Sequence, residues 1–236
     1  MNKTLVFTAT YNEVENINIL IKKILIKPSK VDLLIIDDNS PDNTKETIYK
    51  LKKRYKNLHL IVRERKLGLD TAHKLAYQFA LRRKYKNLIT MDADLSHDPK
   101  VINKMIKVLN KNEFVIGSRY MKGGKCEMGL LRLSLSSLGN KFIKLLLNIN
   151  CHEFTTSYRG FNIKKLKKFH LKKINSKGYS FFMETIFYIN KLNFKIAEVP
   201  IHFKDRINGK SKIPKFELFR TLKNVLFLAL KKNFFN

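Results

Sequence analysis

The sequence predicts an α/β fold in which helices flank both faces of a mostly parallel β-sheet. Short apolar runs alternate with helical stripes through the first half of the chain, as they do in folds with parallel sheets. One run, residues 31–36, is continuous and rich in β-branched side chains, which is typical of a strand buried on both faces. Polar residues follow four of the runs, at the position where parallel sheets bind their ligands.

The first half of the chain contains five predicted strands and four predicted helices. A strand over residues 4–10 precedes a helix with apolar residues at helical spacing from Ile17 to Leu25, which ends before Pro28. After the strand at residues 31–36, Asn43 or Thr44 is a candidate cap for a helix that extends to about Tyr55. The remaining elements are strands at 58–62, 88–91 and 114–116, and helices whose apolar stripes cover 72–80 and 102–109.

The second half is less regular, with predicted helices over 138–147, 180–192 and 214–231 and a strand over 196–199. We expect one domain over residues 1–212, followed by an amphipathic C-terminal helix over residues 213–236. That helix can lie in a membrane interface, pack on its own core or bind a small membrane subunit. Its apolar face consists of Phe216, Phe219, Leu222, Leu226 and Ala229, beside Lys215, Arg220, Lys223, Lys231 and Lys232.

Composition excludes several classes of protein. The 236 residues are 44% apolar, which is enough for a sizeable core and unlike a disordered chain. Cys126 and Cys151 form no C-x-x-C pair, which excludes a disulfide scaffold and a cysteine zinc site. No apolar run approaches the roughly 18 residues of a spanning helix. Residues 4–10 read as a strand rather than a signal peptide, so we expect a cytoplasmic protein.

The net charge of +29 has several readings. It fits nucleic acid, an anionic membrane surface or a phosphate-rich substrate. It also fits an AT-rich genome, because 38 of the 48 basic residues are Lys and Asn and Ile are abundant as well. The charge therefore does not decide the function, although it would draw the chain to anionic lipid. The chain lacks clustered aromatics and any recognised nucleic-acid motif, so we expect no nucleic-acid partner.

The sequence Asp92-Ala93-Asp94 at a predicted strand end is the central chemical feature. Two carboxylates one residue apart on a turn can reach one divalent cation, or one can bind the metal and the other a sugar. Mg²⁺ and Mn²⁺ prefer such oxygen ligands and share them with substrate phosphates. The alternative is a solvated Asp turn.

Three other polar groups follow predicted strands. Asp37-Asp38 can accept hydrogen bonds from a ribose or a base, or can cap the next helix. Tyr11 and Glu13 can stack on a base and accept from it, or can simply begin a helix. Arg119 follows a strand and is suited to phosphate, although an ordinary surface ion pair is the alternative.

The segment 205–212 contains Arg206 and Lys212 and reads as a phosphate-binding loop or an ordinary basic loop. No G-x-S-x-G, P-loop or G-x-G-x-x-G motif is present, and the histidines have no metal-ligand spacing.

Taken together, six segments in unbroken order resemble the dolichyl- or polyprenyl-phosphate mannosyltransferases, which are inverting family 2 glycosyltransferases with the GT-A fold. The likeness covers roughly residues 4–225. Its most specific strings are D-D-N-S-P-D, M-D-A-D-L-S-H and D-R-x-x-G-x-S-K. The segments are residues 11–13, 37–42, 66–69, 91–97, 117–120 and 205–212.

The resemblance implies transfer of mannose from GDP-mannose to a polyprenyl or dolichyl phosphate, with Mg²⁺ or Mn²⁺, at the cytosolic face of a membrane. Matched by position, four groups of residues would take part. Ala9, Tyr11, Glu13, Ile36 and Asp38 would hold the nucleotide; Asp92, Ala93 and Asp94 the metal and diphosphate; Arg119, Arg206 and Lys212 the phosphates; Arg132 and Ser136, with Arg119, the acceptor phosphate.

The chemistry of the residues supports a lipid phosphate acceptor. Such a phosphate is already an anion and needs no general base, whereas a hydroxyl acceptor normally does. The E-D and Q-x-x-R-W motifs of relatives that use hydroxyl acceptors are absent. Catalysis would then depend on positioning, the metal and cationic side chains.

Several positions depart from the family pattern and leave the donor open. Ala9 stands where Pro is usual, Asp70 where Gly is usual and Phe182 where Gln is usual. UDP-glucose or another nucleotide sugar is an alternative donor, a glycan hydroxyl is an alternative acceptor, and a nucleic-acid-binding module is the third hypothesis.

Overall fold

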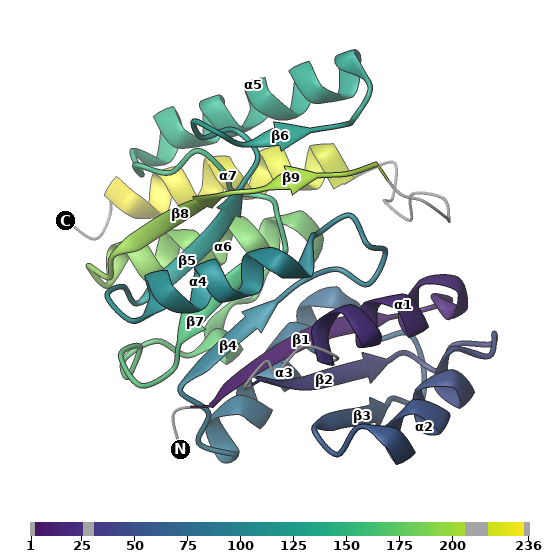
Figure 1. Cartoon of the computed structure of the whole chain (residues 1–236). Coiled ribbons are helices and arrows are strands. Elements are labelled where there is room, and N and C mark those ends of the chain that lie inside the picture. Colours follow the sequence, from purple (N-terminus) through teal and green to yellow (C-terminus); the bar gives the residue numbers. More distant parts are fainter. Residues whose placement is uncertain (1–2, 26–30, 206–216, 234–236) are drawn as a thin grey trace.

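The computed structural model describes residues 3–25, 31–205 and 217–233. Within these ranges seven strands form one sheet in the order β3-β2-β1-β4-β7-β5-β8, with helices on both faces (Figure 1). The strands are β1 (Thr4–Thr10), β2 (Val31–Asp37), β3 (Leu58–Val62), β4 (Asn87–Thr90), β5 (Phe114–Ser118), β7 (Arg159–Asn162) and β8 (Ile196–Pro200); β6 (Lys125–Cys126) and β9 (His202–Phe203) form a separate pair. The helices are α1 (Val14–Leu25), α2 (Thr44–Arg54), α3 (Leu69–Arg82), α4 (Ile102–Leu109), α5 (Leu130–Leu147), α6 (Gly178–Lys191) and α7 (Glu217–Asn233), with short 3-10 turns η1 (Pro99–Val101) and η2 (Leu171–Lys173).

The predicted mostly parallel α/β architecture is confirmed. The neighbours of β1 in the sheet, β2 and β4, both run parallel to it, and every residue of β2 is buried, as its continuous apolar run predicts. Strand β7 is absent from the sequence prediction. It runs antiparallel between β4 and β5, and its sequence R-G-F-N has neither an apolar run nor an alternating pattern.

Helix α5 begins at Leu130, earlier than the predicted start at residue 138. Its first two turns have no buried side chain, so they show no core-facing stripe in the sequence. The predicted start of the last helix, residue 214, lies outside the described residues, in which α7 begins at Glu217.

The core has two parts, one on each face of the sheet. Helices α1, α2 and α4 pack on one face, and α3, α5, α6 and α7 pack on the other. His73 of α3 is fully buried on the second face, with its ring about 5 Å from those of Phe7 and Phe182. This burial, with the charge of Arg159, lowers the pKa of His73 to about 3.

Helix α7 packs on the part of the core that α3, α5 and α6 also cover. Val225 and Leu228 are buried there, and α7 contacts both α5 and α6. Leu222, Leu226, Phe227 and Leu230 on its other side are 45–61% exposed. The buried face of this helix therefore packs on the protein's own core, as one of the three alternatives predicts. Its exposed face could still contact a membrane or a partner subunit. The predicted division at residue 212 stays a prediction. Among the described residues, no helix is long and apolar enough to span a bilayer.

Candidate active site

The loops that carry the predicted site residues meet at one edge of the sheet. β1, β2, β4 and β5 are parallel, so their carboxyl ends lie at this edge. Because β7 runs the other way, its amino end lies there too. The loop over residues 153–158, which leads into β7, is thereby added to the site.

Asp37 fixes the loop after β2. Its carboxylate accepts hydrogen bonds from the hydroxyl of Thr10 at 2.8 Å and from the backbone N–H and hydroxyl of Ser40 at 2.9 and 2.6 Å. The side chain is fully buried. Asp37 therefore shapes the loop and has no surface for a ligand.

The loop after β1 is attached to the same structure. The backbone N–H of Asn12 donates to the Ser40 hydroxyl, and that of Glu13 donates to the Thr44 hydroxyl, both at 3.0 Å. Asp42 accepts from the N–H and hydroxyl of Thr44, so Asp42, rather than either predicted cap, Asn43 or Thr44, supplies the side-chain acceptor at the start of α2. Tyr11 and Glu13, both predicted nucleotide contacts, are held in place by this network.

Asp38 connects these loops to the one after β3. Its carboxylate pairs with Nε and Nη2 of Arg63 and accepts from the backbone N–H of Leu67 at 3.3 Å. Arg63 also donates to the carbonyl of Gly68 at 3.1 Å. The Nζ of Lys66 in the same loop lies 4.6 Å from the centre of the Tyr11 ring. Three loops thus form one wall, and the carboxylate expected to bind nucleotide is already paired with Arg63.

The acidic pair Asp92 and Asp94 follows β4 and is oriented by neighbouring side chains. Ser157 donates its hydroxyl hydrogen to Asp92 at 2.6 Å, and Ser96 does the same to Asp94 at 2.6 Å. The backbone N–H of Asp92 donates to Nδ1 of His97 at 3.1 Å, which leaves the proton of the neutral ring on Nε2. Carboxylates held in this way have a fixed direction before any ligand arrives.

This donor set fits a divalent cation that is shared with a substrate. The carboxylates supply hard oxygen ligands, and their hydroxyl partners resemble the outer contacts that orient metal ligands in proteins. The Asp92 side chain is 36% exposed, whereas Asp94 is buried, so Asp92 is the more accessible of the two. No complete cluster of three His, Cys, Asp or Glu ligands occurs among the described residues. Phosphate oxygens would supply the remaining ligands.

Arg119 lies at the end of β5 and is paired with Glu153. Its Nε and Nη2 donate to the two Glu153 oxygens at 2.7 and 2.8 Å, and Nη2 also donates to the Thr155 hydroxyl at 2.9 Å. Burial opposes both charges, but the pairing outweighs it: the pKa of Glu153 is lowered and that of Arg119 is raised. The predicted phosphate ligand therefore has two of its three guanidinium nitrogens committed to a buried carboxylate.

Other predicted contacts occupy less accessible places. Ala9 is half-buried near the end of β1, and its partner in the sheet, Ile36, is fully buried and has no surface to offer a ligand. Ala93 is also buried. Arg206 and Lys212 lie outside the described residues.

Two of the three predicted acceptor contacts lie on α5. Arg132 is exposed, and the hydroxyl of Ser136 accepts a hydrogen bond from the Tyr120 hydroxyl at 2.7 Å. This bond attaches α5 to the segment that follows β5, directly after Arg119.

Four residues that position the site were not predicted as site residues. Ser157 and His97 orient Asp92, Glu153 holds Arg119, and Arg63 holds Asp38. His97 is buried, and its spacing along the chain gave no sign of a role in the site. Glu153 and Ser157 lie in residues 153–160, whose sequence E-F-T-T-S-Y-R-G departs from the D-x-T-S-G-F-R-A of the family that the chain resembles. This partial likeness was the one available signal.

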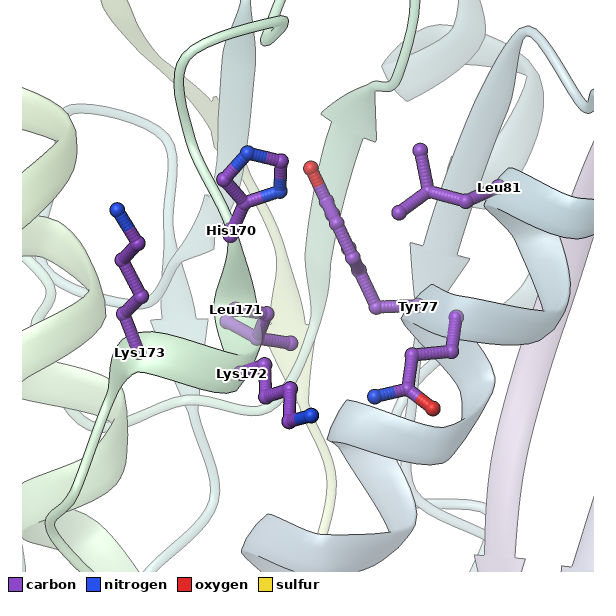
Figure 2. A pocket seen from close by; sticks show the side chains of 7 residues that line it. Tyr77, Leu81, His170, Leu171, Lys172 and Lys173 are labelled. Carbon is purple, nitrogen blue, oxygen red and sulfur yellow. The ribbon is translucent and has the colours of Figure 1, made fainter.

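A pocket of about 440 Å³ lies elsewhere, between α3 and η2 (Figure 2). Tyr77 and Leu81 line it from the second half of α3, and His170, Leu171 and Lys172 line it from the other side. The second half of α3 leads toward the start of β4, away from the carboxyl edge. No predicted site residue lines this pocket.

Residues 5–169 match the model of a family described as glycosyl transferase family 2. The chain belongs to this family. It is 34% identical to polyprenol monophosphomannose synthase of Mycolicibacterium smegmatis, over 89% of this chain and 81% of the relative. It is 32% identical to undecaprenyl-phosphate mannosyltransferase of Micrococcus luteus, over 89% of this chain and 87% of that relative.

The fold of the chain is similar to that of solved glycosyltransferase structures. Glucosyl-3-phosphoglycerate synthase from Mycobacterium tuberculosis, in complex with Mn²⁺, UDP and glucosyl-3-phosphoglycerate, matches with a TM-score of 0.67. The match covers 98% of this chain and 80% of that chain at 15% sequence identity. This likeness confirms the predicted GT-A fold.

Proposed function

We propose that this glycosyltransferase moves mannose from GDP-mannose to a polyprenyl phosphate, with inversion at the sugar carbon. The observation that carries the proposal is the oriented pair Asp92 and Asp94 at the carboxyl edge, in a chain that is similar to two proteins named for polyprenyl-phosphate mannosyl transfer. The wall formed by the loops after β1, β2 and β3 would hold the nucleotide, with the Tyr11 ring stacked on its base and the nearby Lys66 directed to its phosphates.

Asp92 and Asp94 would hold Mg²⁺ or Mn²⁺ against the donor diphosphate. The cation would offset the negative charge that develops on GDP as it leaves. Ser157 and Ser96 keep the two carboxylates in place, so that little reorganisation is needed when the donor binds.

The acceptor phosphate would attack directly. One of its anionic oxygens forms the new bond to the anomeric carbon, the bond from that carbon to GDP breaks, and no proton has to move. Two acid–base candidates of the site are occupied: Nδ1 of His97 accepts the Asp92 N–H, and Glu153 accepts from Arg119 and from the 155–156 turn. This favours an acceptor that needs no base over a glycan hydroxyl.

Cationic side chains and one hydroxyl would hold the acceptor and leaving phosphates. Arg132 and Ser136 of α5 would contact the acceptor phosphate. Arg119 would contribute its remaining guanidinium nitrogen and its positive charge. Arg206 and Lys212 are proposed from the sequence as further phosphate contacts. A lipid-linked acceptor also places the enzyme at a membrane, and we propose peripheral association with the cytosolic face, either directly or through a small membrane subunit.

The test is transfer of labelled mannose from GDP-mannose to a short-chain polyprenyl phosphate in detergent, with Mg²⁺ or Mn²⁺. Unphosphorylated polyprenol is the matched acceptor control, and UDP-glucose is the matched donor control. We expect lipid-linked mannose only with the phosphorylated acceptor and GDP-mannose. Transfer from UDP-glucose instead would replace the donor, and equal use of polyprenol or a glycan would refute the acceptor.

Two variants test the site in the same assay. Asp94→Asn removes one metal ligand, and we expect activity to fall at least a hundredfold. Asp98→Asn changes a nearby carboxylate that only caps η1, where it accepts from the Lys100 N–H at 2.9 Å. Activity of this control should stay near wild type. Equal activity of the two variants would remove the acidic pair from the mechanism.

A further inference from the structure

Helix α5 carries its most apolar face outward. Leu131, Leu135, Leu138, Phe142 and Leu145 recur every three or four residues, so they form one continuous stripe along the helix. Their side chains are 46–81% exposed, and Leu130 at the start of the helix is 83% exposed. A contiguous stripe of this size is rare on the free surface of a protein and marks a binding surface. We call these six residues the α5 stripe.

The opposite side of α5 fixes this orientation. Ile143 and Leu147 are buried in the core. Asn140 is buried as well, and its side chain accepts from the Phe154 N–H at 2.7 Å and donates to the Ser136 carbonyl at 2.8 Å. The stripe therefore cannot turn inward without breaking these contacts.

Basic residues flank the α5 stripe. Arg132, Lys141 and Lys144 lie on the same helix, outside the stripe on its two sides, and α5 has no acidic residue. An apolar face bordered by cations matches the boundary between acyl chains and anionic headgroups, where the stripe is buried and the cations stay in the headgroup layer. A protein partner would have to supply both a long apolar groove and acidic rims.

We propose that the α5 stripe docks this enzyme on the surface of an anionic phospholipid bilayer, with α5 lying in the plane of the interface. This proposal rests on the proposed function, because docking would bring the enzyme to a polyprenyl phosphate whose phosphate lies at that surface. The Tyr120–Ser136 hydrogen bond joins α5 to the end of β5, so docking would bring the carboxyl edge to the headgroup layer. Leu226 and Leu230 of α7, a helix in contact with α5, are exposed as well. Figure 1 shows α5 along the upper margin of the molecule, with α7 below it in the view.

The experiment is flotation of the purified full chain with vesicles of neutral phosphatidylcholine and with vesicles that also contain about one third phosphatidylglycerol. Wild type should float with the anionic vesicles, and less so at high salt. Leu138→Ser combined with Leu145→Ser should lower the partition coefficient about tenfold per substitution. Both side chains are more than 60% exposed, and neither belongs to the predicted acceptor contacts.

The matched control combines Ile19→Ser and Tyr49→Ser. These side chains are 45% and 52% exposed on α1 and α2, which pack on the other face of the sheet. The control should float as wild type does, and unfolding temperatures should confirm that both double variants are folded. Equal flotation of the α5 variant and wild type would overturn the proposal. So would a wild-type dimer that fails to float and that the α5 substitutions convert to a monomer, because the stripe would then join two copies.

Transfer to a short-chain acceptor in detergent separates this proposal from the proposed function. The α5 variant should retain that activity while losing vesicle binding. Wild-type protein that transfers mannose in detergent but ignores anionic vesicles would refute docking alone. Protein that floats but transfers nothing would refute the proposed function alone.

Discussion

Replacement of Glu153 by Gln should destabilise the protein strongly, although the two side chains have nearly the same shape. Glu153 is fully buried and accepts two hydrogen bonds from Arg119, two from Thr155 and one from the Thr156 N–H. Gln keeps one acceptor oxygen and turns the other into an NH₂ group. If the oxygen stays with the 155–156 turn, the new NH₂ faces Nε of Arg119 at about the present distance of 2.7 Å, donor against donor.

The size of the effect follows from the burial of the pair. Removal of one partner from a buried ion pair costs about 3–5 kcal/mol, because the other charge is left without compensation. The Arg119 side chain is only 8% exposed, so water does little to replace Glu153. For a chain of this length, each 1 kcal/mol lowers the unfolding temperature by about 2–4 °C, which predicts a fall of about 6–20 °C.

The assay is reversible urea or thermal unfolding of Glu153→Gln beside Glu127→Gln. Glu127 pairs with His202 at 2.7 Å, but both side chains are more than 40% exposed, so the same chemical change should cost less than about 1 kcal/mol. Glu153→Gln should also reduce mannose transfer, since Arg119 and the 153–158 loop lose their fixed positions. Equal stability of the two variants would refute the reasoning that this pair holds the site together.

Three further outcomes test other parts of the structure. His73 is neutral in the fold with a pKa of about 3 but takes up a proton near pH 6.5 when unfolded, so stability is full above pH 6.5 and falls with pH below it. Between pH 8 and pH 5 the free energy of unfolding should fall by about 2 kcal/mol because of His73. In urea denaturation, the free energy of unfolding of His73→Phe should therefore depend less on pH than that of wild type. Ser157→Ala removes the hydroxyl that orients Asp92, and calorimetric titration with Mn²⁺ and GDP should show about tenfold to a hundredfold weaker metal binding. In Gly124→Ala the new Cβ would lie 2.5 Å from the Arg119 carbonyl oxygen, which should cost about 1–3 kcal/mol in denaturation, whereas Gly139→Ala, a helical site with open space, should raise stability by about 0.5–1 kcal/mol.

Much of the sheet could be predicted from the sequence, because the strands of the first half are short apolar runs. The helices between them have apolar residues at the regular spacing of a helix. β2 is the clearest example, since burial on both faces requires a continuous apolar run. β7 could not be predicted in this way. Arg159 begins it as a fully buried cation, and its burial is possible only because the carbonyls of Phe154, Thr156 and Phe182 accept its hydrogen bonds.

The sequence predicted which loops carry the candidate site, but not which side chains in those loops form ion pairs with one another. The positions of Asp92 and Asp94 follow from the rule that parallel strands carry ligands at their carboxyl ends. The partners of Asp38 and Arg119 do not, because Arg63 and Glu153 are 25 and 34 residues away along the chain and nothing local signals the contact. A charged side chain at a strand end can serve a ligand or hold a neighbouring loop, and only the fold distinguishes these two uses.

The reversed strand β7 explains how the second half of the chain takes part in a site built by parallel strands. A parallel strand in this position would bring its carboxyl end to the edge, and the loop before it would lie at the far edge. The antiparallel direction brings residues 153–158 to the acidic pair, where Ser157 orients Asp92 and Glu153 holds Arg119. The next residue, Arg159, secures the same loop through the carbonyls of Phe154 and Thr156. The same loop reaches α5 through the hydrogen bond from the Phe154 N–H to Asn140. The acidic pair and the helix with the outward apolar stripe are therefore positioned by one short segment, and a change in that segment would disturb both together.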